Sequence, residues 1–147
     1  MSAVHTVTAT AATLSDDSRV MSGVLLLGLV TVESGGLYLL KVVRGAAGVT
    51  PFQKKFARAG HAHAGVLLLL ALICQLLADS TTQTGALSWL SRSGVAVAAI
   101  LIPAGFFLSS MGSGATRPNR LIALVFAGAA LLAASLVSLA VGLLTAR

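Results

Sequence analysis

The sequence is poor in charge, in cysteine and in aromatic residues, and these scarcities exclude several classes of protein. Only 10% of the 147 residues are charged, whereas soluble domains carry about 25%. A small soluble domain must cover its surface with polar groups, so this composition excludes a small soluble domain. The single cysteine, Cys74, excludes an intrachain disulfide and a cysteine-cluster metal site. It lies in an apolar run, where we expect a small buried hydrophobic side chain.

The sequence also lacks the residues that nucleic-acid binding and enzyme activity need. The formal net charge is +6, but the basic residues are spread over loop edges, and there is no basic and aromatic platform for stacked bases. We therefore expect no nucleic-acid partner. The sequence has no Walker loop, dinucleotide fingerprint, HExxH motif or GxSxG elbow. We expect no enzyme activity, since an enzyme acting on lipid or quinone would lack a nucleophile or redox group.

What the sequence does contain is long apolar stretches, since 56% of its residues are hydrophobic. A hydrocarbon core of about 30 Å takes about 20 helical residues to cross, and four stretches are long enough. The sequence therefore predicts an all-α, integral membrane four-transmembrane-helix bundle in a single domain, 1–147. The expected helices cover residues 16–41, 51–78, 93–111 and 118–145.

Local signals place the starts of the first two helices. Ser15 is a good N-cap and is followed by two aspartates, which the helix dipole favours in a first turn. The segment 50–53, Thr-Pro-Phe-Gln, combines a capping threonine, a proline at the first helical position and a glutamine three residues after the cap. In the fourth helix, Gly128, Ser135 and Ser138 are small residues that allow close helix contact.

The distribution of Lys and Arg predicts the orientation. Basic residues are concentrated in the connections between helices one and two and between helices three and four, and fewer lie on the other side. By the positive-inside rule, both termini are extracytoplasmic in a bacterial cytoplasmic (inner) membrane. The basic residues of the two connections are Lys41, Arg44, Lys54, Lys55, Arg58, Arg117 and Arg120.

Three ionisable residues lie inside the apolar stretches: Glu33 in the first helix, and His61 and His63 in the second. An ionisable side chain within a bilayer costs about 2.5–3.5 kcal/mol on insertion scales and is by default a functional candidate. All three fall in the predicted cytoplasmic half of the membrane. They are the candidate residues of an ion or proton pathway.

The same three residues allow other interpretations. His61 and His63 are two residues apart, so their side chains point about 200° apart on a helix and cannot chelate one ion. Glu33 with one histidine, repeated around an oligomer axis, could bind a divalent metal or relay protons. A structural hydrogen bond between glutamate and histidine is the simpler alternative. A haem ligated by two histidines needs facing helices, so we do not expect one within a single chain; the cofactor is otherwise unknown.

Pro103 lies in the middle of the third apolar stretch and is the third candidate feature. A proline there removes one backbone hydrogen bond and predicts a kink. The freed carbonyl, with Ser109 and Ser110, could line a cavity on the cytoplasmic side. The simpler alternative is a packed kink without a cavity.

The segments VESGG, FARAGHAHAG and PAGFF extend these inferences. Together they resemble four-span membrane proteins of high-GC (actinobacterial-type) bacteria, over most of the chain. The resemblance implies a membrane bundle and no particular activity. Our leading hypothesis is a homo-oligomer or a subunit of a larger membrane complex that handles protons or ions, or binds a metal. The rival is a structural or assembly subunit without a bound or transported species.

Overall fold

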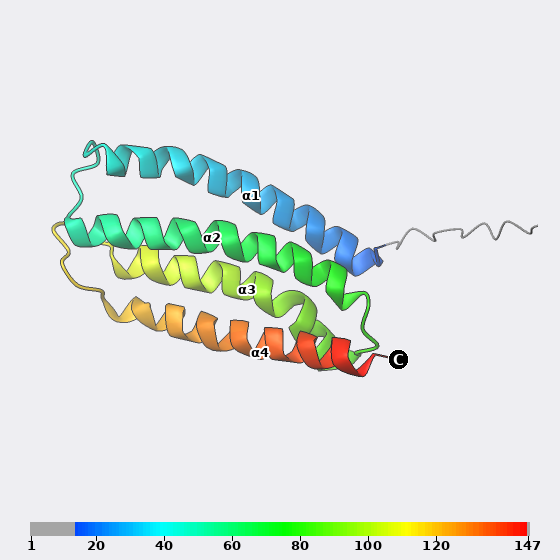
Figure 1. The fold of residues 1–147 in the computed structure, drawn as a ribbon. Coiled ribbons are helices and arrows are strands. Elements are labelled where there is room, and N and C mark those ends of the chain that lie inside the picture. The colour runs from blue at the N-terminus through cyan, green and yellow to red at the C-terminus, as the bar shows by residue number, and fades with distance from the viewer. Residues whose placement is uncertain (1–13, 147) are drawn as a thin grey trace, which may run out of the picture.

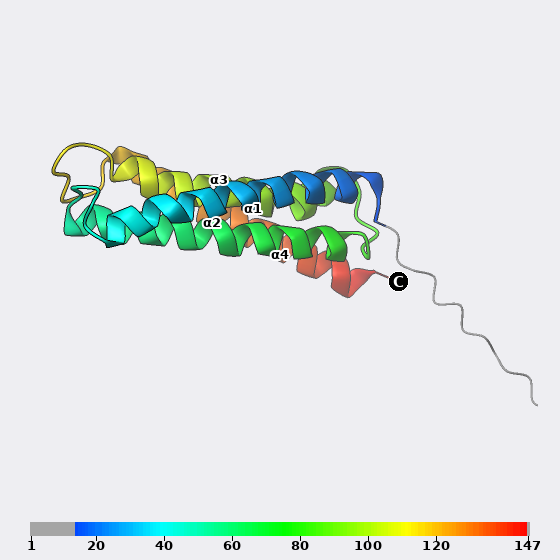
Figure 2. The same cartoon turned by 90° about the horizontal axis from the view of Figure 1, so that it is seen from above.

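The computed structural model describes residues 14–146, and these form an all-helical bundle without strands (Figure 1). Each of its four long helices is apolar and long enough to cross a membrane, as predicted. The chain runs up and down between neighbouring helices, and the view from above shows them roughly parallel along one axis (Figure 2). The elements are α1 (Asp16–Val43), α2 (Pro51–Ala78), α3 (Gly85–Ser109), the 3-10 turn η1 (Arg120–Ile122) and α4 (Ala123–Thr145).

The first two helices begin as the local signals predict. Ser15 caps α1 by accepting a hydrogen bond from the backbone N–H of Ser18 at 3.2 Å. At the start of α2, Thr50 Oγ1 accepts from the backbone N–H of Gln53 at 3.2 Å, and Gln53 Oε1 accepts from that of Thr50 at 3.0 Å. This reciprocal pair is a complete capping box. α2 covers the predicted residues, and α1 extends to Val43.

The third and fourth helices differ from the predicted bounds. α3 begins at Gly85 instead of Ser93 and ends at Ser109 instead of Met111. Arg92 lies outside the predicted bounds but within the helix, where its guanidinium meets Asp79 and Ser18. The fourth helix does not start at Pro118. Asn119 accepts from the backbone N–H of Leu121 at 2.8 Å and begins η1, after which α4 follows.

Packing is unequal among the four helices. α3 lies between α2 and α4, whereas α1 packs mainly on α2. Gly105 and Gly128 allow the backbones of α3 and α4 to approach closely: a Cβ at either position would lie 2.6 Å from a neighbouring side chain. Gly128, Ser135 and Ser138 are buried, as expected for close contact. Cys74 is buried in the core, as predicted.

α1 is the most exposed helix in the bundle. Its only buried residues are Ser18, Leu25 and Val42. Many of its exposed residues are large and apolar, and they form a surface that lipid or another protein chain would cover.

Candidate functional site

Glu33 lies on the outer surface of α1 and is exposed. Its carboxylate has no hydrogen bond or ion pair with any residue between 14 and 146. The nearest hydroxyls along the helix are engaged elsewhere, since Thr31 donates to the carbonyl of Gly28 at 2.6 Å and Ser34 donates to the carbonyl of Thr31 at 2.7 Å. Glu33 is thus an acidic side chain within a candidate span that finds no partner in its own described chain.

His61 lies at the contact between α1 and α2. Its ring is half-buried and faces Gly35 and Gly36: a Cβ on Gly35 would lie 3.7 Å from Nδ1, and one on Gly36 3.6 Å from Cε1. The two glycines make room for the imidazole. Glu33 lies about 200° from Gly35 and about 60° from Gly36 around the helix, so it stands beside the face that meets His61.

His63 faces another direction from α2 and is exposed. Its Nδ1 lies 2.8 Å from the backbone carbonyl oxygen of Ala59, and its ring centroid lies 5.2 Å from that of Phe106 in α3. In the neutral ring this contact places the proton on Nδ1 and leaves Nε2 as the outward acceptor. The structure therefore separates the two histidines, as their spacing predicts.

The structure does not bring the three candidates together as a metal site. No group of three His, Cys, Asp or Glu side chains in the described part of the chain is close enough to hold a metal ion. A three-ligand site of Glu33, His61 and His63 within one chain is therefore not formed. The physical reason is the rotation of α1, which directs its glycine pair towards α2 and its glutamate outwards.

Pro103, Ser109 and Ser110, the residues of the predicted kink and cavity, lie in α3 or directly after it. Ser110 lines a cavity of about 410 Å³ between the end of α3 and residues of α1 and α2. Pro103 lies inside α3 and is buried, and Ser109 is buried too, but neither lines this cavity. The hydroxyls of Ser109 and Ser110 donate to carbonyls of their own helix at 3.4 and 3.0 Å.

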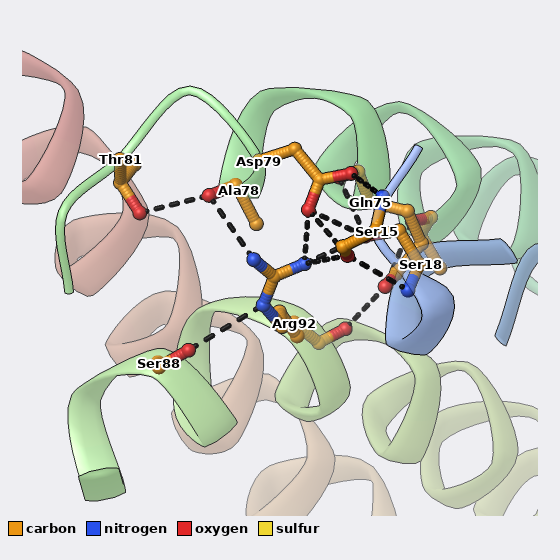
Figure 3. A network of polar contacts seen from close by, with 9 residues as sticks. Ser15, Ser18, Gln75, Ala78, Asp79, Thr81, Ser88 and Arg92 are labelled. Carbon is orange, nitrogen blue, oxygen red and sulfur yellow. Dashed lines mark hydrogen bonds and ion pairs between the residues drawn. The ribbon is translucent and has the colours of Figure 1, made fainter. Parts of the chain in front are cut away.

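A polar network that the sequence analysis missed joins α1, α2 and α3 at the end of the bundle where α2 ends (Figure 3). Arg92 Nη1 donates to Asp79 Oδ1 and to Ser18 Oγ, both at 2.6 Å. Ser15 donates its hydroxyl to Asp79 Oδ1 at 2.7 Å and its backbone N–H to Oδ2 at 3.0 Å. Gln75 donates through Nε2 to the backbone carbonyl of Arg92 at 2.5 Å.

The carboxylate of Asp79 is held in its charged form. Its partial burial would by itself raise the pKa, but the hydrogen bonds that it accepts from Ser15, Arg92 and Ser18 lower the pKa to about 2. The Asp79 and Arg92 side chains are 17% and 20% exposed. This ion pair is therefore more sheltered than the surface pair of Arg19 and Asp16.

A second polar group joins the loop before α3 to α4. Gln83 donates through Nε2 to the carbonyl of Ser138 at 2.9 Å, and Ser91 donates to Gln83 Oε1 at 2.7 Å. The amide of Gln83 also fits against Gly142, where a Cβ would meet it at 2.5 Å. Each network contains a glutamine close to the end of an apolar stretch: Gln75 lies in the first network and Gln83 in the second. These two amides were the signal that the sequence offered.

No protein-family model, curated protein or solved structure significantly matches the chain. The class of the protein therefore rests on its geometry: an all-helical protein with four candidate membrane-spanning helices. Its polar residues differ in kind. The networks around Arg92 and Gln83 are internal, whereas Glu33 and His63 are ionisable residues exposed on the apolar helices.

Proposed function

We propose that the protein is a subunit of a homo-oligomer in a bacterial inner membrane, in which Glu33 of one copy and His63 of a neighbouring copy form an intramembrane proton- or ion-handling site. The observation behind the proposal is the exposed position of Glu33 on α1, without a partner among residues 14–146. A carboxylate that faced lipid would cost about 2.5–3.5 kcal/mol on insertion scales. A neighbouring copy that supplies a hydrogen-bond partner removes much of that cost.

The depths of the two side chains support this pairing. Glu33 lies ten residues before the end of α1 at Val43, and His63 lies twelve residues after the start of α2 at Pro51. At a rise of 1.5 Å per residue these positions are about 15 Å and about 18 Å from the same end of the bundle. Both side chains are exposed. A neighbouring copy that presents its α2 face to α1 would therefore bring them to a similar level.

The proposed orientation and membrane are based on the charge pattern and on the resemblance. The connections at the Val43 end hold most of the basic residues, which supports a cytoplasmic location for that end and extracytoplasmic termini. The segments VESGG, FARAGHAHAG and PAGFF support a bacterial source by their similarity to four-span proteins of high-GC bacteria. Glu33 and His63 then lie in the cytoplasmic half of the membrane or near its centre.

The rival function is a structural or assembly subunit without a transported species. The exposed apolar surface of α1 supports it as well, because that surface suits a protein interface whether or not protons move. Both proposed functions require an oligomer, but they predict different effects of substituting Glu33. In a purely structural subunit, neutral glutamine preserves the hydrogen bond and therefore preserves function.

Proton flux and oligomeric state together test the proposal. The purified protein is reconstituted into liposomes with an internal pH-sensitive dye, and the decay of an imposed pH gradient is measured for the parent, Glu33→Gln and Asp16→Asn. We expect flux in the parent and in Asp16→Asn, which changes an exposed acid at the helix end, and loss of flux in Glu33→Gln. Native mass spectrometry should show an oligomer. A monomer, a parent without flux, or unchanged flux in Glu33→Gln overturns the proposal.

A further inference from the structure

Two adjoining cavities form a groove between α1 and α3, at the end of the bundle opposite to the basic connections. One, of about 470 Å³, is lined by polar residues and by aliphatic residues of α1. The other, of about 300 Å³, is almost entirely apolar and continues along the two helices as far as Gly28 and Ile100. Met21, Val24 and Ser93 line both, so the two are continuous.

The groove exists because α1 packs on α2 and leaves α3 largely uncovered on this side. From Asp17 to Gly28 the wall provided by α1 is twelve residues long, and from Trp89 to Ile100 the wall provided by α3 has the same length. At the helical rise each wall is about 16 Å long. A groove with a polar entrance and a long apolar extension matches the shape of an amphiphile, which has a polar headgroup and a hydrocarbon tail.

The polar end of the groove holds a buried acceptor without a donor. Gln75 of α2 lines this end and is only 1% exposed. Its Nε2 donates to the carbonyl of Arg92, but its Oε1 is buried and accepts no hydrogen bond from the described residues. An unsatisfied buried carbonyl is unfavourable, so an arriving donor would be stabilised here.

The other groups at this end also favour a donor over an acceptor. Asp17 is exposed at the rim and its carboxylate makes no hydrogen bond within residues 14–146. Arg92, the obvious anion ligand, is already engaged: its three guanidinium nitrogens donate to the Ser88 hydroxyl, to the Ala78 carbonyl and to the Asp79 carboxylate with its serine neighbours. Because Asp79 neutralises Arg92, Asp17 leaves this end of the groove with a net negative charge.

We propose that the groove binds a phospholipid whose headgroup carries a primary ammonium, with one acyl chain along the apolar walls. The ammonium N–H groups donate to the Asp17 carboxylate and, after a small shift of the groove wall, to Gln75 Oε1. A choline headgroup has the same charge but no N–H donor, and an anionic headgroup is repelled by Asp17. The site therefore distinguishes headgroups by hydrogen bonding in addition to charge.

The single tryptophan provides the measurement. Trp89 is the only tryptophan in the chain and lines the polar end of the groove, so a lipid with brominated acyl chains quenches its fluorescence when bound. Full-length protein in detergent is titrated with brominated phosphatidylethanolamine. Unlabelled phosphatidylethanolamine, phosphatidylcholine and phosphatidylglycerol with the same acyl chains then compete. We expect the ethanolamine lipid to compete about three- to tenfold more strongly than the choline lipid.

Two neighbouring acids supply a matched pair of variants. Asp16 and Asp17 both lie in the first turn of α1 and are exposed, but Asp16 pairs with Arg19 and does not line the groove. Asp17→Asn should bring the preference for ethanolamine over choline close to one, whereas Asp16→Asn should leave it unchanged. Gln75→Met should also reduce the preference, and Gln83→Met, which removes a comparable amide outside the groove, should not.

Three results of the competition experiment would overturn the proposal. The first is equal competition by the ethanolamine and choline lipids in the parent. The second is an equal loss of preference in Asp16→Asn and Asp17→Asn, which would show an effect of surface charge alone. The third is strongest competition by phosphatidylglycerol. Ala96→Phe, placed in the apolar part of the groove, should weaken quenching by every lipid; unchanged quenching in this variant would contradict the assigned position of the tail.

Discussion

Arg92 Nη1 lies 2.6 Å from Asp79 Oδ1, and this contact joins the second turn of α3 to the residue that caps α2. The same nitrogen reaches Ser18 in α1 at 2.6 Å, so one guanidinium connects three helices. The end of α1 at this network is therefore attached by directed hydrogen bonds, although most of the helix surface is exposed. The polar network fixes the position of a helix that packing alone holds weakly.

Replacing Arg92 by methionine should destabilise the protein by about 2–3 kcal/mol, because Asp79 would remain partly buried without its cation. Thermal unfolding in detergent, followed by circular dichroism, measures the loss. Arg19→Met is the matched control: its ion pair with Asp16 is 68% and 88% exposed, and such surface pairs contribute at most about 1 kcal/mol. Similar losses in Arg92→Met and Arg19→Met would contradict a special role for the network.

Acidification should weaken the same network over a defined range of pH. Because the folded-state pKa of Asp79 is lowered to about 2, its contribution to stability is complete above the ordinary aspartate pKa of about 4 and is lost as the pH falls towards 2. The expected loss is about 1–2 kcal/mol. Unfolding curves between pH 6 and pH 2 test this, and Asp79→Asn should show a smaller loss over the same range. An equal pH dependence of parent and variant would assign the effect to other carboxylates.

The parts of the fold that depend on neighbouring residues could be predicted from the sequence. The Ser15 cap and the Thr50–Gln53 capping box form between residues that are close in the sequence, so the local sequence was sufficient to predict where α1 and α2 begin. The start of α3 could not be found in this way. Its polar first turns are stabilised by contacts with distant residues, since Arg92 meets Asp79 and Ser18. A hydropathy pattern records the charge of Arg92 but not its partner.

The candidate site shows the same limit in a different form. Spacing correctly separated His61 from His63 on α2, but it did not give the rotation of α1 relative to α2. That rotation is set by Gly35 and Gly36, which pack on His61, and it directs Glu33 outwards. Spacing alone would not have predicted this outcome, because Glu33 is about 200° from Gly35 but only about 60° from Gly36 around the helix.

The close approach of α3 and α4 should make Gly128 intolerant of a side chain. A Cβ there would lie 2.6 Å from Ile102 Cγ1 and 3.1 Å from the Ile102 backbone nitrogen. Gly128→Ala should therefore force the helices apart and cost about 1–3 kcal/mol. Gly23→Ala is the control, since a Cβ at Gly23 would have no neighbouring atom within 4 Å and alanine favours a helix by about 1 kcal/mol. Equal thermal stabilities of the two variants would contradict this packing.

Cysteine cross-linking should detect the proposed contact between copies. In a Cys74→Ala background, which has no other cysteine, the doubly substituted chain Glu33→Cys/His63→Cys should form intermolecular disulfides on mild oxidation in native membranes. Disulfides require Cα atoms within about 7 Å, so efficient formation reports direct contact. Copies related by a two-fold axis would pair Glu33 with His63 in both directions and give a cross-linked dimer, whereas copies arranged in a ring would give products beyond dimers on a non-reducing gel.

The two single-cysteine variants, and a control pair at different depths in the membrane, show how the cross-linked products are to be interpreted. Glu33→Cys alone and His63→Cys alone should give little cross-linking, because the proposed contact brings two different positions together and leaves identical positions apart. Val20→Cys paired with His63→Cys should also give little, since Val20 is exposed on α1 but lies near the opposite end of the helix. Efficient cross-linking of Glu33→Cys alone would indicate a two-fold contact between α1 helices. In that arrangement a glutamate faces a glutamate across the interface, and His63 does not supply the proton partner.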